Sequence, residues 1–137
     1  MTNKDTAKPH ILVIEDDELT REAVLLKLEK VGFASEFAKD GVEGMNSLLS
    51  GRAFDGILLD LRMPNGDGFM FMEKKNSDAR FLDIPIIVFS NLSQSEFIDR
   101  AVSLGAKGYL VKAQHSIQDV VYEVKKCITN GVCTIDT

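Results

Sequence analysis

One aspartate, Asp60, directly follows the short apolar run Gly56–Leu59 and precedes a loop rich in proline and glycine, residues 61–68. The apolar run is typical of a buried strand. Burying an unpaired carboxylate at the end of such a strand is unfavourable, so the position suggests a use for it. In open sheets of parallel strands, ligands bind at the carboxyl ends of the strands. Asp60 is therefore the first candidate for a functional residue.

Polar residues also follow three other apolar runs, at residues 11–14, 84–89 and 108–111. They are two acids, a hydroxyl and an ammonium, namely Glu15 and Asp16, Ser90, and Lys112. The carboxyl ends of parallel strands meet at one edge of a sheet, so these residues are expected to form a single site with Asp60.

Three converging carboxylates indicate a cation. Glu15, Asp16 and Asp60 would repel one another and their pKa values would rise unless a positive charge lies between them. Mg²⁺ (or Mn²⁺) accepts this arrangement, because it binds one or two carboxylates together with water and phosphate oxygens. Acids at this point of a chain can instead cap a helix, where negative charge is favoured. We accept that alternative for Asp17 and Glu18, but not for Asp16 and Asp60.

Lys112 and Ser90 fit a phosphoryl group. Each alone would be an ordinary lysine or turn serine, but beside a metal and three acids an ammonium and a hydroxyl are suitable phosphate ligands. Neither GxxxxGK[ST] nor GxGxxG occurs, which argues against a nucleotide. The sequence therefore favours a phosphoryl group attached covalently to a carboxylate.

The composition excludes several classes of protein. The chain has 137 residues, 45% of them apolar, which suits one domain with a substantial core. Its net charge of −5 argues against a basic nucleic-acid-binding face. No apolar run approaches the roughly 18 residues of a membrane span. Residues 1–9 lack the apolar segment of a signal peptide and are expected to form a disordered lead-in.

The two cysteines, Cys127 and Cys133, are six positions apart. The favoured interpretation is a pair of reduced thiols in a cytosolic protein. A disulfide or a shared metal remains the alternative, although the pair offers only two ligands.

The elements that must position the site alternate between strand and helix. The expected strands are Ile11–Glu15, Ala34–Ala38, Gly56–Asp60, Ile84–Ser90 and Gly108–Val111. The expected helices are Glu18–Val31, Gly41–Ser50, Gly68–Asn76, Gln94–Leu104 and Ser116–Thr129. Such short βα units imply a doubly wound α/β domain, with one parallel sheet, right-handed crossovers and helices on both faces. This domain is expected over residues 10–130, followed by a short tail at 131–137.

Four segments make the chain similar to the receiver domain of two-component response regulators. They are ILVIEDD (11–17), LDLRMPNGDG (59–68), IPIIVFSN (84–91) and GAKGYLVK (105–112), in the order and spacing usual for that family. The resemblance covers residues 10–130 and implies a flavodoxin-like five-stranded sheet with strand order 2-1-3-4-5. With only a short segment after the fifth helix, the chain most resembles single-domain regulators of the chemotaxis or relay type.

The resemblance implies a role for each residue of the site. Asp60 would be the phosphoacceptor. Asp16 and Asp60 would bind Mg²⁺ directly, Glu15 would bind it through a water molecule, and the backbone carbonyl of Arg62 would be a further ligand. Lys112 would bind a phosphoryl oxygen.

The resemblance also implies a switch and a partner surface. The Ser90 hydroxyl would bind a phosphoryl oxygen in the active state, and the ring of Tyr109 would turn inward when Ser90 moves. Phe97 and Arg100, with Tyr109, would lie on or near the surface that contacts partners.

The sequence departs from the family beside Ser90 and Lys112. Asn91 stands where Ala or Gly is usual, which would narrow access to the phosphoryl group. Ala113 stands where Pro is usual. A cis peptide bond before a residue other than proline costs about 2.5–4 kcal/mol, so the Lys112–Ala113 bond is expected to be trans.

The leading hypothesis is therefore a cytoplasmic signalling switch that accepts a phosphoryl group from a sensor histidine kinase or a histidine phosphotransfer protein. It would change its affinity for a downstream protein and would not act as an enzyme on other molecules. It would bind neither nucleic acid directly nor a membrane. A relay intermediate that passes the group to a second histidine protein is an alternative, and a constitutive pseudo-receiver is another. A phosphatase is disfavoured, because aspartyl-phosphate phosphatases usually carry a second acid where this chain has Arg62.

Overall fold

The computed structural model describes residues 8–64 and 67–136. Most of the predicted lead-in, residues 1–7, lies outside the described residues, as do Asn65, Gly66 and Thr137. Within the described part, no helix combines the length and the apolar composition needed to cross a membrane.

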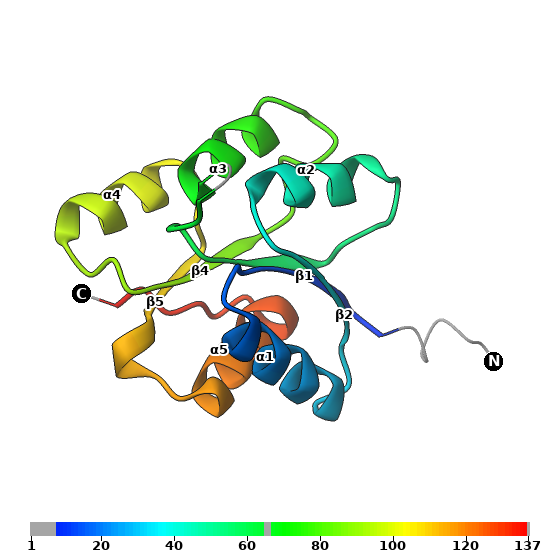
Figure 1. The fold of residues 1–137 in the computed structure, drawn as a ribbon, viewed down its shortest axis with the longest axis vertical. Helices are drawn as coiled ribbons and strands as arrows, with labels where there is room; N and C mark the ends of the chain where they lie inside the picture. Colours follow the sequence, from blue (N-terminus) through cyan, green and yellow to red (C-terminus); the bar gives the residue numbers. More distant parts are fainter. Residues whose placement is uncertain (1–7, 65–66, 137) are drawn as a thin grey trace.

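The centre of the fold is a five-stranded parallel sheet in the order β2-β1-β3-β4-β5, as predicted (Figure 1). The strands are β1 (His10–Ile14), β2 (Ala34–Ala38), β3 (Gly56–Leu59), β4 (Ile86–Ser90) and β5 (Gly108–Val111). Every residue of β3, β4 and β5 is buried, which explains why these strands are continuous apolar runs rather than alternating ones.

Five helices cover both faces of the sheet. They are α1 (Glu18–Lys30), α2 (Gly41–Leu49), α3 (Gly68–Asn76), α4 (Ser95–Ser103) and α5 (Ile117–Asn130). Helices α2, α3 and α4 lie on one face, and α1 and α5 lie on the other (Figure 1). The sequence prediction placed every helix boundary within one residue of these positions.

The two faces of the sheet bury separate cores, because successive residues of a strand point to opposite sides. Leu12 and Ile14 of β1 join the core beneath α2–α4, whereas Ile11 and Val13 join the core beneath α1 and α5. Both cores depend on the same strands, so the sheet holds its carboxyl edge in a fixed position between two packed layers.

Strand β4 is shorter than predicted. Ile84 and Pro85 precede it, since proline has no N–H to donate, although the Pro85 carbonyl still accepts a hydrogen bond from the Ile57 N–H at 2.9 Å.

None of the peptide bonds in the described residues is cis, so the predicted trans bond between Lys112 and Ala113 is confirmed. After β5 the chain enters a short 3₁₀ turn, η2 (Lys112–Gln114), which leads into α5.

The prediction of two reduced thiols is wrong, because Cys127 and Cys133 form a disulfide. Helix α5 ends at Asn130 and is capped by Gly131, whose φ of 73° is left-handed and favours glycine. The chain turns back at this point, and the two cysteine Cα atoms come to 4.5 Å. This separation lies within the range that a disulfide requires.

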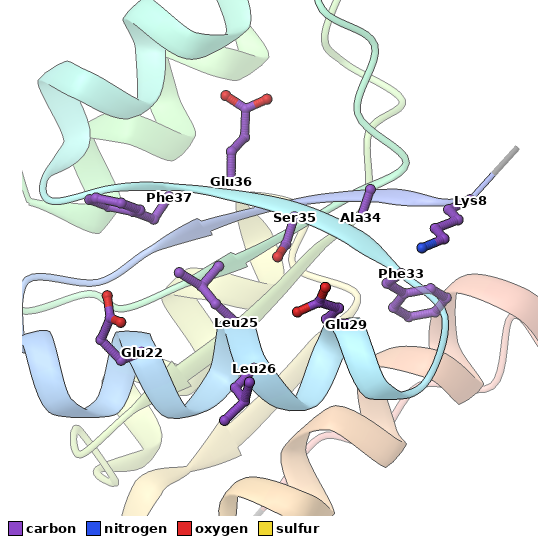
Figure 2. Close-up of a pocket in the computed structure, with 10 residues that line it drawn as sticks. All are labelled: Lys8, Glu22, Leu25, Leu26, Glu29, Phe33, Ala34, Ser35, Glu36 and Phe37. Carbon is purple, nitrogen blue, oxygen red and sulfur yellow. The ribbon is translucent and has the colours of Figure 1, made fainter.

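A hollow of about 690 Å³ runs along the outer side of β2 and α1 (Figure 2). Leu25 and Phe33 line it with apolar groups, and Glu22 and Glu29 line it with carboxylates. It contains none of the predicted site residues, so the chemistry has to be sought at the carboxyl ends of the strands.

Candidate functional site

Three carboxylates meet where β1 and β3 end. The N–H of Glu15 donates to the Ala38 carbonyl at 3.0 Å, and the N–H of Asp60 donates to the Ile14 carbonyl at 3.0 Å. Sheet hydrogen bonds thus continue one residue beyond each strand and fix both acids. Carboxylate oxygens of Glu15, Asp16 and Asp60 all lie within 4.8 Å of one another. The predicted convergence is confirmed.

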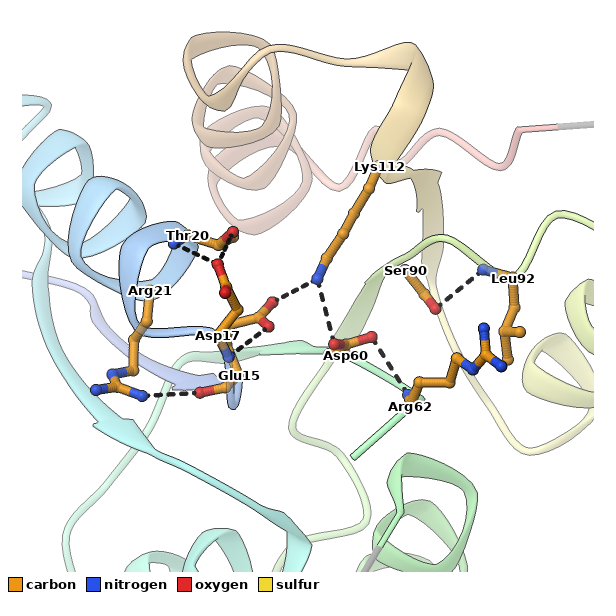
Figure 3. Close-up of polar contacts among 9 residues, drawn as sticks. All are labelled: Glu15, Asp17, Thr20, Arg21, Asp60, Arg62, Ser90, Leu92 and Lys112. Atoms are coloured by element: carbon orange, nitrogen blue, oxygen red, sulfur yellow. Dashed lines mark hydrogen bonds and ion pairs between the residues drawn. The ribbon is translucent and has the colours of Figure 1, made fainter. Parts of the chain in front are cut away.

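Lys112 reaches this cluster from the end of β5 (Figure 3). Its Nζ lies 2.9 Å from Glu15 Oε1 and 3.2 Å from Asp60 Oδ2. Burial alone would lower the pKa of Lys112, but the charges of Asp60 and Glu15 raise it above its ordinary value. The lysine therefore stays charged and supplies a fixed positive charge beside Asp60.

Glu15 is the most perturbed acid of the cluster. Its side chain is only 3% exposed, and burial together with the Asp60 charge raises its pKa from 4.5 to about 7, against the opposing effect of Lys112. The single positive charge of Lys112 does not balance the negative charges of three carboxylates. The site therefore favours the binding of one further cation.

This shift predicts a pH dependence of stability in the absence of divalent metal. Between pH 4.5 and about 7 the folded state binds more protons at Glu15 than the unfolded state does, so the free energy of unfolding falls as the pH rises. One pKa unit corresponds to about 1.4 kcal/mol, so the loss should be about 2–3 kcal/mol. Urea denaturation in EDTA at several pH values measures it.

The matched variant is Glu15→Gln, which cannot titrate and should lose this part of the pH dependence. Parallel pH profiles for the wild type and Glu15→Gln would show that Glu15 does not cause the slope.

The loop after β1 is held by its own side chains. Asp17 caps α1, as predicted, by accepting hydrogen bonds from the Thr20 N–H at 2.9 Å and the Thr20 hydroxyl at 2.6 Å. The Asp17 N–H donates to Glu15 Oε2 at 3.1 Å, and Arg21 Nη1 donates to the Glu15 carbonyl at 3.2 Å. Sequence reasoning missed Thr20, which holds Asp17, and Arg21, which donates to the Glu15 carbonyl, because neither belongs to a recognised motif.

Both ends of the loop after β3, as far as the structure describes them, make backbone contacts. The Arg62 N–H donates to Asp60 Oδ1 at 3.3 Å, and the Gly68 N–H donates to the Leu61 carbonyl at 3.1 Å. A Cβ on Gly68 would lie 2.6 Å from the Asp60 carbonyl oxygen, so only glycine allows this approach. The metal-binding role of the Arg62 carbonyl stays a prediction.

Ser90 and Tyr109 both contact the backbone of Leu92. The Leu92 N–H donates to Ser90 Oγ at 3.2 Å, and the Tyr109 hydroxyl donates to the Leu92 carbonyl at 2.6 Å. Both side chains are fully buried, and burial and the Asp60 charge raise the pKa of Tyr109 to about 12. The Tyr109 ring thus points inward. A shift of the Ser90 hydroxyl toward Asp60 would remove the acceptor of the Leu92 N–H, whose residue also holds the Tyr109 hydroxyl.

The two predicted surface residues of α4 face α3. The guanidinium of Arg100 lies 4.2 Å from the centre of the Phe69 ring, and Nη2 is 3.6 Å from Glu73 Oε2. Phe97 is partly buried, with its ring centre 6.3 Å from that of Phe69. A hollow of about 550 Å³ separates this part of α4 from the loop after β3. Arg100 is half exposed, while Tyr109 and most of Phe97 are covered.

Several curated proteins contain a region whose sequence is similar to this chain. The chain is 33% identical over 120 residues to the chemotaxis protein CheV3 of Helicobacter pylori. This match covers 81% of the chain and 39% of CheV3. It is 35% identical over 104 residues to the DNA-binding dual master transcriptional regulator RpaA of Synechocystis, covering 76% of this chain and 43% of RpaA. The match therefore spans less than half the length of these two relatives.

Solved structures share the fold. The chemotaxis protein CheY4 of Vibrio cholerae superposes with a TM-score of 0.80 at 26% identity, covering 88% of this chain and 98% of CheY4. The receiver domain of HemR from Leptospira biflexa superposes with a TM-score of 0.79 at 30% identity. The match covers 89% of this chain and 95% of the HemR domain.

A family model ties these similarities together. The model described as the response regulator receiver domain matches residues 11–124, a range that includes the three acids, Ser90, Tyr109 and Lys112. The order of the strands and the carboxylate cluster are those that the four sequence segments predicted. The chain therefore belongs to the receiver domain family of two-component response regulators.

Proposed function

We propose that this receiver domain is a phosphorylation-controlled switch in which Asp60 accepts a phosphoryl group. The observation that supports this most directly is the position of the Lys112 ammonium, 3.2 Å from Asp60 Oδ2 and 2.9 Å from Glu15 Oε1. Asp60 is 6% exposed, so the ammonium acts in a poorly hydrated site, where its charge has a stronger effect than in water.

The donor in this proposal is a phosphohistidine of a sensor kinase or a phosphotransfer protein. An Asp60 carboxylate oxygen forms a bond to phosphorus, and the bond from phosphorus to the histidine nitrogen breaks, leaving the electron pair on the imidazole. Lys112 offsets the charge that gathers on the phosphoryl oxygens during transfer.

The acids also fit Mg²⁺. Oxygen ligands from Asp16 and Asp60, with Glu15 acting through water and the Arg62 carbonyl as a further ligand, match the preference of this ion for carboxylates and water. When bound, Mg²⁺ neutralises negative charge on the acids and on the phosphoryl oxygens.

A direct test is incubation of the wild-type protein with a small-molecule phosphodonor, with Mg²⁺ or with EDTA, followed by intact mass. We expect the mass of one added phosphoryl group in Mg²⁺ and very little in EDTA. A mass that never changes under either condition would contradict the proposal and favour a constitutive binding module.

Metal affinity should depend unequally on the two acids after β1. Asp16→Asn removes a direct ligand and should weaken Mg²⁺ binding about 100-fold, whereas Glu15→Gln acts through water and should weaken it about tenfold. Titration calorimetry measures both, with Glu18→Gln, an exposed acid in the first turn of α1, as the control. Equal losses for Asp16→Asn and Glu15→Gln would show that the assignment of direct and indirect ligands is wrong.

We further propose that the signal leaves through the surface of α4, β5 and α5. The support is the path Ser90–Leu92–Tyr109, which joins the end of β4 to the middle of β5. Phosphorylation in Mg²⁺ should therefore shift the NMR resonances of Leu92, Arg100 and Tyr109. Shifts confined to α1 and α2 would contradict this route.

The remaining features of the proposal follow from that role. The protein would act as a stand-alone receiver in the cytoplasm, would catalyse only its own phosphorylation and dephosphorylation, and would bind a downstream protein. A relay intermediate would use the same chemistry and would differ in passing the group to a second histidine.

A further inference from the structure

The segment that follows α5, residues 131–136, lies along the outer edge of β5 (Figure 1). The Tyr109 N–H donates to the Thr134 carbonyl at 2.9 Å, and the Asp136 N–H donates to the Tyr109 carbonyl at 2.8 Å. These two bonds make a parallel bridge between Tyr109 and Ile135. The segment thus takes the place that a sixth strand would occupy.

Side chains add to this attachment. The Asp136 carboxylate accepts from the Val111 N–H at 2.8 Å and lies 2.8 Å from His115 Nε2. Thr134 Oγ1 donates to Glu123 Oε1 of α5 at 2.7 Å. These polar contacts join the segment to β5, to the turn after it and to α5.

The segment buries little apolar surface of its own. Val132 is 55% exposed and Ile135 is 39% exposed. Hydrogen bonds near the surface with few apolar contacts are the kind of structure that opens locally at low cost in free energy. The Cys127–Cys133 disulfide, which begins on buried Cys127 of α5, therefore has a large share in holding the segment in place.

We propose that this disulfide is a thiol–disulfide switch that controls whether the edge of β5 is covered. A dithiol reductant transfers two electrons and two protons to the disulfide, leaves thiols on Cys127 and Cys133, and itself becomes a disulfide. Disulfides are generally reduced in the cytosol, so in the cytoplasm of the proposed function this bond would be open in reducing conditions and closed in oxidising ones. Cys133, which is less buried than Cys127, is the more accessible sulfur for the exchange.

Reduction would uncover backbone groups that now have partners. The N–H and C=O of Tyr109 and the N–H of Val111 would become an open sheet edge, a surface to which other chains can add. This edge belongs to β5, in the middle of the surface that we propose for partner binding. The link to partners and the cytosolic compartment rest on the proposed function, whereas the covering itself does not depend on phosphorylation.

Hydrogen exchange of the Tyr109 and Val111 amides, followed by NMR, tests the switch. In the oxidised wild-type protein both amides should exchange slowly. After addition of dithiothreitol they should exchange at least about tenfold faster, while amides of β1 and β3 keep their protection. The variant Cys127→Ser/Cys133→Ser should behave like the reduced protein without reductant.

A second variant separates the disulfide from the polar contacts. Asp136→Ala in the oxidised protein should speed exchange at Val111, whose amide loses its acceptor, and leave Tyr109 protected by Thr134. Alkylation with iodoacetamide in denaturant, which exposes the buried Cys127, should add no group to the oxidised protein and two to the reduced one, as read by intact mass.

Three results would overturn the switch. Unchanged protection of Tyr109 and Val111 after full reduction would show that the segment stays without its disulfide. Loss of protection from hydrogen exchange in β1 and β3 as well would show that the disulfide stabilises the whole fold and not the segment alone. Two alkylated thiols without reductant would show that the disulfide does not form. Labelling by a phosphodonor, measured in parallel, reports on Asp60 separately, so failure of one proposal is distinguishable from failure of the other.

Discussion

Replacing Asp60 with asparagine is expected to abolish covalent phosphorylation while leaving the domain folded. The amide has nearly the same shape as the carboxylate but is not a nucleophile toward phosphorus, so intact mass after treatment with a phosphodonor should show no added group. The loss should be complete. Among the described residues Glu15 is the other buried acid in direct contact with Lys112, so any added mass in this variant would point to Glu15 as a second acceptor.

The same variant should be more stable than the wild type in metal-free buffer at neutral pH. Asp60 contributes to the raised pKa of Glu15, so removing its charge relieves repulsion in the buried cluster while Lys112 keeps its contact with Glu15. The gain should be about 1 kcal/mol in urea denaturation, the scale of one shifted pKa unit.

Asp55→Asn is the control for both measurements. Asp55 precedes β3, is exposed, and accepts a hydrogen bond from the His10 N–H at 2.8 Å at the opposite end of the strand. It should be phosphorylated like the wild type. Persistent labelling of Asp60→Asn would refute the assignment of the phosphoacceptor.

The sequence was sufficient for the sheet and for the cluster of acids, for physical reasons. Strands buried on both faces are continuous apolar runs, and a charged residue at the end of such a run stands out. Glu15, Asp60 and Lys112 could therefore be found one strand at a time, and the parallel order of the strands brought them together.

Other parts of the site depend on contacts that leave no pattern in the sequence. The connection of Ser90 to Tyr109 passes through the backbone of Leu92, and any residue except proline could donate and accept there. Arg21 reaches a backbone carbonyl, again without a motif.

The disulfide was missed for a different reason. The predicted helix already ended between the two cysteines, at Thr129, but the expectation of a cytosolic protein favoured reduced thiols. The left-handed turn at Gly131 brings Cys133 back to Cys127, and its path along β5 depends on Thr134 and Asp136 finding partners far away in the sequence.

Among substitutions that add one methyl group in the described part of the site, Gly68→Ala is expected to reduce stability and phosphorylation most. The new Cβ would lie 2.6 Å from the Asp60 carbonyl oxygen and 2.7 Å from Leu61 Cα, both backbone atoms that cannot turn aside. Alanine would otherwise favour α3 by about 1 kcal/mol over glycine. Overpacking of a fitted interior costs about 1–3 kcal/mol and more where backbone must move, so a net loss of about 2 kcal/mol should appear in urea denaturation.

The consequence for function follows from which atoms must move. Relief of the clash displaces Asp60 or the start of α3. Because the clash is with backbone atoms of Asp60 and Leu61, we expect Asp60 to shift, and this shift takes its carboxylate away from the contact with Lys112 at 3.2 Å. Phosphorylation by a small-molecule donor should therefore slow at least about tenfold, since misplacement of a reacting group by about 1 Å can cost two orders of magnitude.

Met70→Ala, on the exposed side of the same helix, is the control and should change neither measurement appreciably. A Gly68→Ala protein that is phosphorylated as fast as the wild type would mean that the loop after β3 can shift without moving Asp60. The contact of Gly68 with the Asp60 backbone would then be a matter of stability alone.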